Sequence, residues 1–181
     1  MKHLASRLMI SLFILSAGPA ALAALKPGDK APDFSAQASL GGQITPFSLA
    51  TALKKGPVVL YFYPAAFTTG CTIEAHLFAE AIDRYEALGA TVIGISRDSI
   101  DTLNKFSVSA CRSKFAVAAD ADQKIMTSYD ALMPQSGHAS RTSYVIAPDH
   151  TIIYEYSSPS PDRHAENTLQ ALQQWVSSQK K

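Results

Sequence analysis

Two apolar runs separated by one amphipathic helix are the feature that most constrains how this chain can fold. Residues 58–63 read Val-Val-Leu-Tyr-Phe-Tyr and end at Pro64, and residues 91–96 form a second apolar run. Runs that are apolar at nearly every position are typical of strands buried on both faces of a sheet. A strand, a helix and a strand connected at this length predict a right-handed parallel βαβ unit. We therefore expect an α/β fold.

The helix between the two runs is predicted from apolar positions at three- and four-residue spacing. The pattern starts at Cys71 and stops at Gly89, a residue suited to the C-terminal end of a helix. The spacing predicts a buried helix face made of Ile73, Leu77, Ala81, Tyr85 and Leu88.

The alternation of helices and strands continues after this unit. Residues 99–108 look helical and residues 115–119 look like a strand. Asp122 is placed to cap a further helix that runs to about residue 129.

The last part of the chain predicts a hairpin and a helix. Residues 142–147 and 151–156 are strand-like and flank the turn at residues 148–150, so we expect an antiparallel pair at this side of the sheet. The final helix is expected to open at Ser160-Pro161, because proline suits the first helical position.

The N-terminus has the layout of a secretory signal peptide. Lys2 and Arg7 precede the apolar run 8–15, and Ala21-Leu22-Ala23 supplies the small-residue pattern of a cleavage site. We predict cleavage after Ala23 and an exported, periplasmic protein with a single domain at residues 24–181. The alternative is a retained membrane anchor, but the apolar run is short for a span and a polar, turn-rich segment follows it.

Charge excludes two classes of partner. Removal of Lys2 and Arg7 changes the 16 basic and 15 acidic residues of the whole chain to 14 and 15. With no basic stripe or acidic run left, we expect no nucleic-acid binding and no membrane contact after signal cleavage.

Cys71 and Cys111 are the two cysteines of the chain. In an exported protein, the count alone favours one structural disulfide. That reading makes the protein a binding or scaffold module and predicts that reduction unfolds it. The sequence around Cys71 instead favours a catalytic role for this cysteine.

Cys71 follows a central strand and lies in the first turn of the next helix, where sites collect in open α/β sheets. Free backbone N–H groups and the helix dipole favour a thiolate there. For a thiol in general, lowering the pKa from about 8.5 to about 6 yields roughly thirtyfold more thiolate but about tenfold lower nucleophilicity. A fast reaction therefore needs positioned hydrogen-bond donors near the sulfur.

At this point the residues resemble a known family. Tyr61-Phe62-Tyr63-Pro64, Phe67-Thr68 and Gly70-Cys71-Thr72 resemble the active-site signature of the peroxiredoxins, in the form of the bacterioferritin-comigratory or Q-type subfamily. The resemblance extends from about Leu25 to the final helix. It implies a thioredoxin-like fold with a central mixed sheet flanked by helices.

The resemblance also implies roles for individual residues. Cys71 is similar to the peroxidatic cysteine, Thr68 to the hydroxyl that contacts the peroxide and Pro64 to the residue that shields the thiolate. Arg141 matches the family arginine beside the sulfur, and Glu74 matches a residue that orients it. For Glu74, simple complementarity to the helix dipole is the alternative. The implied activity is reduction of hydrogen peroxide and organic hydroperoxides.

The implied cycle needs a second thiol to resolve the Cys71 sulfenic acid. Many Q-type relatives carry it five residues after the peroxidatic cysteine, where this chain has His76. Cys111 is similar to a less common placement of the resolving cysteine, so we expect an intramolecular disulfide. Either the two helices already lie close or, as we favour, the Cys111 segment unwinds locally.

The remaining expectations concern partners and competing functions. The resemblance implies a thioredoxin-like or other dithiol reductant and leans toward a monomer. The alternatives are a thioredoxin-like disulfide oxidoreductase, which needs a cysteine where Glu74 stands, and a one-cysteine peroxidase. A Cys-His hydrolase needs an imidazole beside Cys71, and we expect His76, His138, His150 and His164 to be surface residues. No Cys/His cluster predicts a metal, and no cofactor is predicted.

Overall fold

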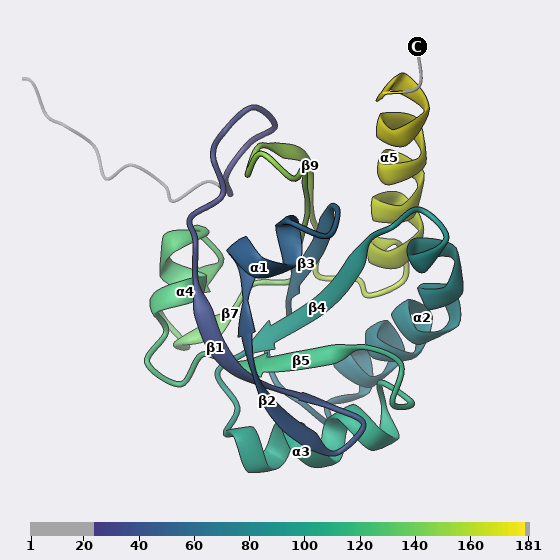
Figure 1. Cartoon of the computed structure of the whole chain (residues 1–181). Helices are drawn as coiled ribbons and strands as arrows, with labels where there is room; N and C mark the ends of the chain where they lie inside the picture. Colours follow the sequence, from purple (N-terminus) through teal and green to yellow (C-terminus); the bar gives the residue numbers. More distant parts are fainter. Residues whose placement is uncertain (1–23, 180–181) are drawn as a thin grey trace, which may run out of the picture.

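A seven-stranded mixed sheet forms the centre of the molecule, with strand order β2-β1-β5-β4-β3-β8-β9 (Figure 1). The computed structural model describes residues 24–179, and the predicted signal peptide at residues 1–23 lies outside them. The strands of this sheet are β1 (Ser35–Leu40), β2 (Gln43–Ser48), β3 (Val58–Phe62), β4 (Thr91–Ser96), β5 (Ala116–Ala119), β8 (Thr142–Ile146) and β9 (Ile152–Ser157). A short separate hairpin pairs β6 (Leu132–Met133) with β7 (His138–Ala139).

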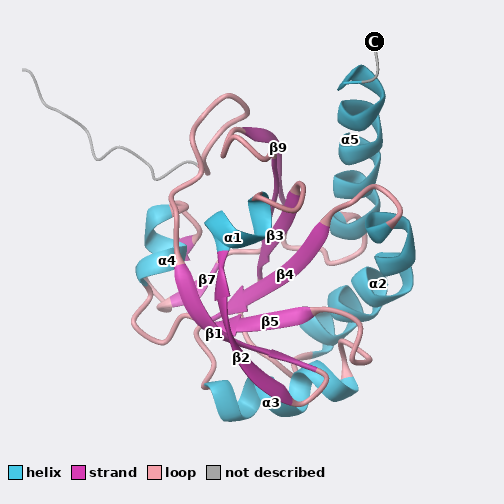
Figure 2. Ribbon diagram, viewed as in Figure 1, coloured by secondary structure: helices cyan, strands magenta, loops and turns pink. Residues whose placement is uncertain are grey.

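Helices cover both faces of the sheet (Figure 2). One apolar cluster joins the sheet to three helices and another joins its opposite face to two. The first set is α2 (Thr69–Glu86), α3 (Ile100–Ser109) and α5 (His164–Gln179), and the second set is α1 (Leu49–Leu53) and α4 (Lys124–Ser128). The expected α/β fold with a central mixed sheet flanked by helices is confirmed.

The predicted βαβ unit is present as β3, α2 and β4. β3 pairs with β4 in parallel and with β8 in antiparallel register. All five residues of β3 are buried, and alternate side chains enter opposite apolar clusters, with Tyr61 beneath α2 and Leu60 on the other face. Two-sided burial explains why this strand is apolar at every position.

The predicted buried face of α2 was wrong in part. Ile73 is 41% exposed, whereas Ala75, Phe78 and Ile82 are buried. The ring of Phe78 stacks on Tyr61 with centroids 4.3 Å apart, and this contact sets the rotation of the helix on the sheet. The same rotation turns position 74 toward the interior.

The predicted cap of α4 is only part of the start of this helix. Asp122 Oδ1 accepts from the backbone N–H of Lys124, the first residue of α4, at 3.4 Å. The carboxylate of Asp120 accepts the next two free donors, the backbone N–H groups of Ile125 and Met126, at 3.1 and 2.8 Å. Asp120 is buried at the end of β5, so it faces the first turn of α4 directly. A carboxylate there satisfies donors that have no partner within the helix.

The last helix begins at His164 and not at the predicted Ser160-Pro161. Residues 160–163 form a turn in which the Ser160 hydroxyl donates to Asp162 at 2.8 Å. The first residue of α5 is a fully buried histidine.

The hairpin β1-β2 is an element that the sequence patterns did not single out. Its turn is Gly41-Gly42, with φ angles of +56° and +82°, which glycine adopts without strain. β1 pairs antiparallel with β5 and so extends the sheet on the side away from β9. Within residues 24–179, no helix combines the length and the apolar character that a membrane span requires.

Candidate active site

The site lies where β3 ends and α2 begins. Thr68 occupies the N-cap position of α2 with extended backbone angles, and Cys71 follows in the first helical turn with a side chain that is 2% exposed. Backbone N–H groups in a first turn have no acceptor within the helix. Cys71 therefore lies at the positive end of a helix, at the carboxyl end of a central parallel strand, as predicted.

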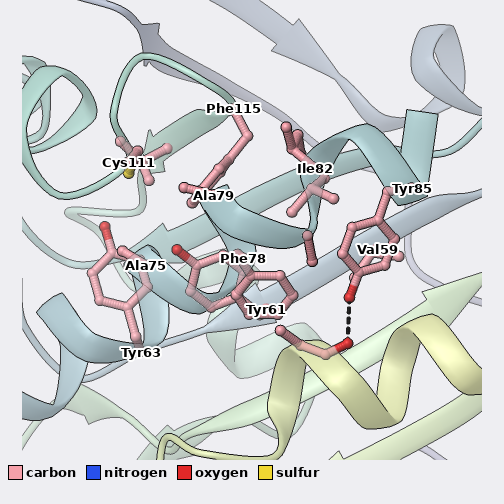
Figure 3. Packing of buried hydrophobic residues seen from close by; sticks show 14 of the residues in the cluster. Val59, Tyr61, Tyr63, Ala75, Phe78, Ala79, Ile82, Tyr85, Cys111 and Phe115 are labelled. Carbon is pink, nitrogen blue, oxygen red and sulfur yellow. Dashed lines mark hydrogen bonds between the residues drawn. The ribbon is translucent and has the colours of Figure 1, made fainter. Parts of the chain in front are cut away.

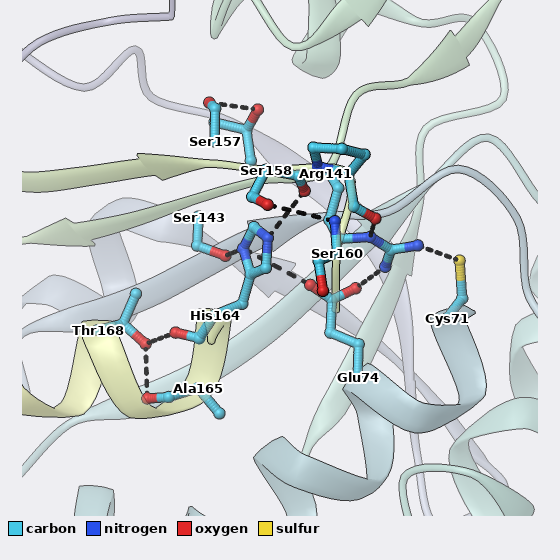
Figure 4. A network of polar contacts seen from close by, with 12 residues as sticks. Cys71, Glu74, Arg141, Ser143, Ser157, Ser158, Ser160, His164, Ala165 and Thr168 are labelled. Carbon is cyan, nitrogen blue, oxygen red and sulfur yellow. Dashed lines mark hydrogen bonds and ion pairs between the residues drawn. The ribbon is translucent and has the colours of Figure 1, made fainter. Parts of the chain in front are cut away.

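Sheet register brings Arg141 to the same place. Thr142 in β8 pairs with Phe62, the last residue of β3, so Arg141 lies beside the point where the chain leaves the sheet toward Cys71. Its Nη2 atom is 3.6 Å from the Cys71 Sγ atom (Figure 4). A β-carbon added at Gly70 would lie 3.1 Å from the same Nη2 atom, so the glycine leaves room for the guanidinium.

Glu74 holds the other side of the guanidinium. Its side chain is fully buried one turn after Cys71, and its Oε2 atom accepts a hydrogen bond from Arg141 Nη1. Burial raises the pKa of Glu74 to about 8, although Arg141 acts to lower it. A buried carboxyl oxygen that accepts from one side of a planar guanidinium fixes the direction of the remaining N–H groups, one of which points at sulfur.

His164 completes this network, and the expectation that it lies on the surface was wrong. The imidazole is fully buried, with Nδ1 2.8 Å from Ser143 Oγ and Nε2 3.1 Å from the Ser158 carbonyl (Figure 4). Because a carbonyl oxygen only accepts, the proton lies on Nε2. Nδ1 is also 3.7 Å from Glu74 Oε1, an oxygen that has no hydrogen-bond partner.

The burial of His164 follows from its place on α5. His164, Thr168 and Leu172 recur at four-residue spacing and all three are buried, so they form the inner stripe of the helix. That spacing is the signal in the sequence that could have identified it. The other predicted surface histidine near the site, His138, is half-buried, and its Nδ1 lies 2.9 Å from the Pro64 carbonyl.

Hydrogen bonds hold the loop that carries Pro64 and Thr68 at several points. Pro64 is held by His138, and the backbone N–H of Ala66 donates to Asp98 Oδ2 at 2.8 Å. The exposed Thr68 hydroxyl donates to the Ala65 carbonyl at 3.0 Å, which leaves its oxygen free to accept a further hydrogen bond. These hydrogen bonds hold Pro64 and Thr68 in defined positions before Cys71.

Phe67 in this loop is strained and rests on the helix that carries Cys111. Its φ angle is +63°, which is unusual for a bulky residue, and its ring is 53% exposed. The edge of that ring contacts Phe106 of α3, with centroids 5.2 Å apart. Phe106 also stacks on Tyr63, so one aromatic side chain contacts both the loop and the sheet.

Cys111 is a free, fully buried thiol just after α3, packed among the apolar residues of the cluster beneath α2 (Figure 3). Cys71 belongs to the same cluster. Burial raises the pKa of the Cys111 thiol well above its usual range. The two residues that follow, Arg112 and Ser113, both have positive φ angles, of 51° and 56°. The structure therefore brings Cys71, Glu74 and Arg141 together and holds Cys111 as a buried thiol beside a strained turn.

Protonation of His164 is expected to weaken folding in acid. Burial lowers its pKa to about 4, whereas the unfolded imidazole has its ordinary value of about 6.5. Between these two values the unfolded chain binds the extra proton, so the free energy of unfolding falls as the pH is lowered through this window, by at most about 3 kcal/mol.

Denaturant unfolding at pH 7, 5.5 and 4.5 measures this effect. His164→Asn keeps a polar side chain that does not titrate, and its free energy of unfolding is expected to fall less steeply with acid than that of the wild type. The pKa of Glu74 is raised in the folded state, so its contribution has the opposite sign, increasing stability as the pH falls through 8 toward 4.5. Equal slopes for the two proteins would contradict the assignment to His164.

Comparisons with known proteins bear on the chemistry of this site. A family model described as the AhpC/TSA family matches residues 27–155. A Mycobacterium tuberculosis protein named as a peroxiredoxin is 34% identical over 152 residues, which are 82% of this chain and 96% of that protein. A chloroplastic peroxiredoxin Q of Oryza sativa subsp. japonica is 30% identical over 148 residues, 81% of this chain and 66% of that protein. The crystal structure of peroxidoxin BcpB from Mycobacterium tuberculosis has a TM-score of 0.76 and 32% identity, and the match covers 83% of this chain and 97% of that one.

Proposed function

This chain belongs to the AhpC/TSA family and is a peroxidase of the bcp and peroxiredoxin Q group, and we propose that Cys71 is the thiol that reduces its peroxide substrate. The substrates are hydrogen peroxide and organic hydroperoxides. The observation that carries the proposal is the Arg141 Nη2 atom, 3.6 Å from the Cys71 sulfur and held by a fully buried Glu74.

The first step is a two-electron oxidation of sulfur. The Cys71 thiolate attacks the terminal oxygen of the peroxide, the S–O bond forms as the O–O bond breaks, and water or an alcohol leaves after taking up a proton. Cys71 becomes a sulfenic acid. Negative charge moves from sulfur to the leaving oxygen, so a donor that spans both positions lowers the barrier.

Arg141 and Thr68 have the chemistry that this step needs. The guanidinium is charged at every relevant pH and presents several N–H groups in a fixed plane, one toward sulfur and one toward Glu74. The Thr68 hydroxyl can accept the O–H of the peroxide while it donates to Ala65. Pro64 lines the approach to Arg141 and contributes no N–H of its own.

Resolution of the sulfenic acid is assigned to Cys111. Attack requires a thiolate, and burial raises the pKa of Cys111, so the thiol reacts only after its segment opens. Two features support such opening. The backbone strain at Arg112 and Ser113 is released when the turn unfolds, and the backbone of Phe67, whose ring contacts Phe106 of α3, also has a strained φ angle.

Titration of the fully reduced protein with one equivalent of hydrogen peroxide is expected to produce one intramolecular disulfide bond, between Cys71 and Cys111. Peptide mapping under non-reducing conditions detects this disulfide. In Cys111→Ser, the expected products are the sulfenic acid at one equivalent and the sulfinic acid in excess peroxide, because no thiol intercepts the first product. Wild-type protein that yields only sulfenic and sulfinic acids would instead be a one-cysteine peroxidase.

The reductant is proposed to be a thioredoxin-like or other dithiol protein, acting on a monomer. Thioredoxin dependence is typical of the family, and a dithiol carrier reverses an intramolecular disulfide by exchange. The signal-peptide pattern supports an exported, periplasmic location, in which case the carrier is an exported protein as well.

A further inference from the structure

The guanidinium of Arg141 is held at three of its atoms. Nη1 donates to Glu74 Oε2, Nη2 lies 3.6 Å from the Cys71 sulfur, and Nε donates to the Pro159 carbonyl at 3.2 Å. Because the guanidinium is planar, the contacts at Nη1 and Nε decide where the N–H group of Nη2 points. The groups that hold Glu74 and Pro159 in place therefore also direct Arg141 at the sulfur.

His164 contacts the segment that holds Nε and lies next to Glu74 (Figure 4). Its Nε2 atom donates to the Ser158 carbonyl at 3.1 Å, and the next carbonyl along the chain is that of Pro159. The backbone N–H of Ser158 also donates to the Arg141 carbonyl at 3.2 Å. The two-residue segment 158–159 is thus held by the imidazole and in turn holds the arginine at two points.

The other edge of the imidazole faces the free oxygen of Glu74. Nδ1 of His164 is 3.7 Å from Glu74 Oε1, which has no hydrogen-bond partner among the described residues. A neutral imidazole with its proton on Nε2 presents a lone pair at Nδ1, which suits a carboxyl group that carries a proton. Burial raises the pKa of Glu74 to about 8, in agreement with a protonated carboxyl group at neutral pH. The pair therefore favours the form in which Oε1 carries the proton and Oε2 accepts from Arg141.

The position of the imidazole is set by the sheet. His164 is the first residue of α5 and is fully buried, with Nδ1 2.8 Å from Ser143 Oγ. Its ring also meets the ring of Tyr156 at a steep angle, with centroids 4.8 Å apart. Ser143 and Tyr156 are directly paired in the antiparallel strands β8 and β9. A buried ring that contacts a strand pair in this way has little freedom to move.

We propose that His164 is a positioning residue for the reaction of Cys71 with peroxide, and that it acts through Arg141. The proposal rests on the proposed function of Cys71. His164 fixes the segment 158–159 and the Glu74 carboxyl group, and these direct the Nη2 N–H group at sulfur. Without the imidazole, the guanidinium remains in the site with a wider range of orientations, so the donor to the reacting atoms is present but poorly aligned.

Two substitutions at position 164 separate the two edges of the imidazole. The amide of His164→Gln extends to the position of Nε2 and can donate to the Ser158 carbonyl, whereas the shorter amide of His164→Asn reaches only the position of Nδ1. The measured quantity is the second-order rate constant for stopped-flow oxidation of the reduced protein by hydrogen peroxide. We expect His164→Asn to lower it about ten- to thirtyfold and His164→Gln to keep it within about threefold of the wild type.

A double-mutant cycle with Arg141→Ala tests whether the effect passes through the guanidinium. Where there is no arginine to position, His164→Asn is expected to change the rate constant by less than about twofold. A purely structural role of His164 would instead slow the reaction by the same factor with and without the arginine. Non-additivity is thus the result that identifies a positioning residue.

The control is Thr168→Val, which removes a buried hydroxyl from the same face of α5, 2.7 Å from the Tyr85 hydroxyl. It is expected to lower the free energy of unfolding and to keep the wild-type rate constant. A wild-type rate constant for His164→Asn, an equal loss in His164→Gln, or a full loss that persists with Arg141→Ala each overturns the inference and leaves the role of Cys71 standing. Wild-type protein that does not react with hydrogen peroxide overturns the proposed function itself.

Discussion

Cys71→Ser is expected to remove the reaction with hydrogen peroxide, with a second-order rate constant reduced by more than about 10³-fold. A serine hydroxyl at the same position is not ionised at neutral pH, and the thiolate is the nucleophile in this chemistry. No other group at the site replaces it, because Cys111 is fully buried and its pKa is raised. Stopped-flow consumption of peroxide by reduced protein measures the loss.

The matched control is Cys111→Ser, which removes the other thiol of the chain. Its first turnover is expected to be as fast as that of the wild type, because the sulfur that attacks the peroxide is intact, while its later turnovers fail without a resolving thiol. If Cys71→Ser reacted as fast as the wild type, or if Cys111→Ser lost the first turnover, the two cysteines would have been assigned to the wrong roles.

Arg141→Ala is expected to lower the rate constant by about 10²- to 10³-fold, the range found when one preorganised donor to a developing charge is removed. The variant loses the N–H group that lies 3.6 Å from the Cys71 sulfur and the cation that faces the buried Glu74. Burial already raises the pKa of Glu74 to about 8 with the arginine present, and loss of the cation raises it further, so the Glu74 carboxyl group stays protonated at neutral pH. The same stopped-flow assay measures the effect.

Two further variants separate charge from geometry at this position. Arg141→Lys keeps a positive charge, but one ammonium group does not reproduce the planar fork that reaches both Cys71 and Glu74, so we expect a rate between those of wild type and Arg141→Ala. Arg84→Ala removes an exposed arginine of α2 that pairs with Glu166, and it is expected to change the rate by less than about twofold. A rate for Arg141→Ala within about threefold of the wild type would exclude the guanidinium as the donor.

Much of the central fold can be predicted from the sequence, because strands that are buried on both faces of a sheet are apolar at nearly every position. β3 and β4 lie almost where the apolar runs predict them, and Gly89, with a φ angle of +72°, ends the turn after α2 as expected. The short strands have no comparable pattern in the sequence. β6 and β7 contain two residues each, and their position depends on distant contacts such as the one between His138 and Pro64.

The errors in the helices have a common origin. Apolar residues occur on two neighbouring stripes of α2, and the packing of the Phe78 stripe against Tyr61 and Phe115 leaves Ile73 facing outward. At α4, two aspartates near the predicted start both accept backbone N–H groups, and the end of β5 places the buried Asp120 at the donors of Ile125 and Met126. Local spacing identifies a helix, but its rotation and its first residue depend on the surface against which it packs.

The candidate site, like the fold, was determined partly by the sequence and partly by the tertiary structure. The strand, the loop and the helix start around Cys71 are continuous in sequence, so the sequence by itself determined where the proposed reactive thiol lies and which helix end would favour its thiolate. Resemblance to a family indicated Arg141 and Glu74. Only the tertiary structure decided that the guanidinium spans Cys71 and Glu74, that His164 is buried behind them and that Cys111 is enclosed in the apolar cluster. These contacts join residues 21 to 90 positions apart, and their geometry is set by sheet register and side-chain packing, which local sequence patterns do not encode.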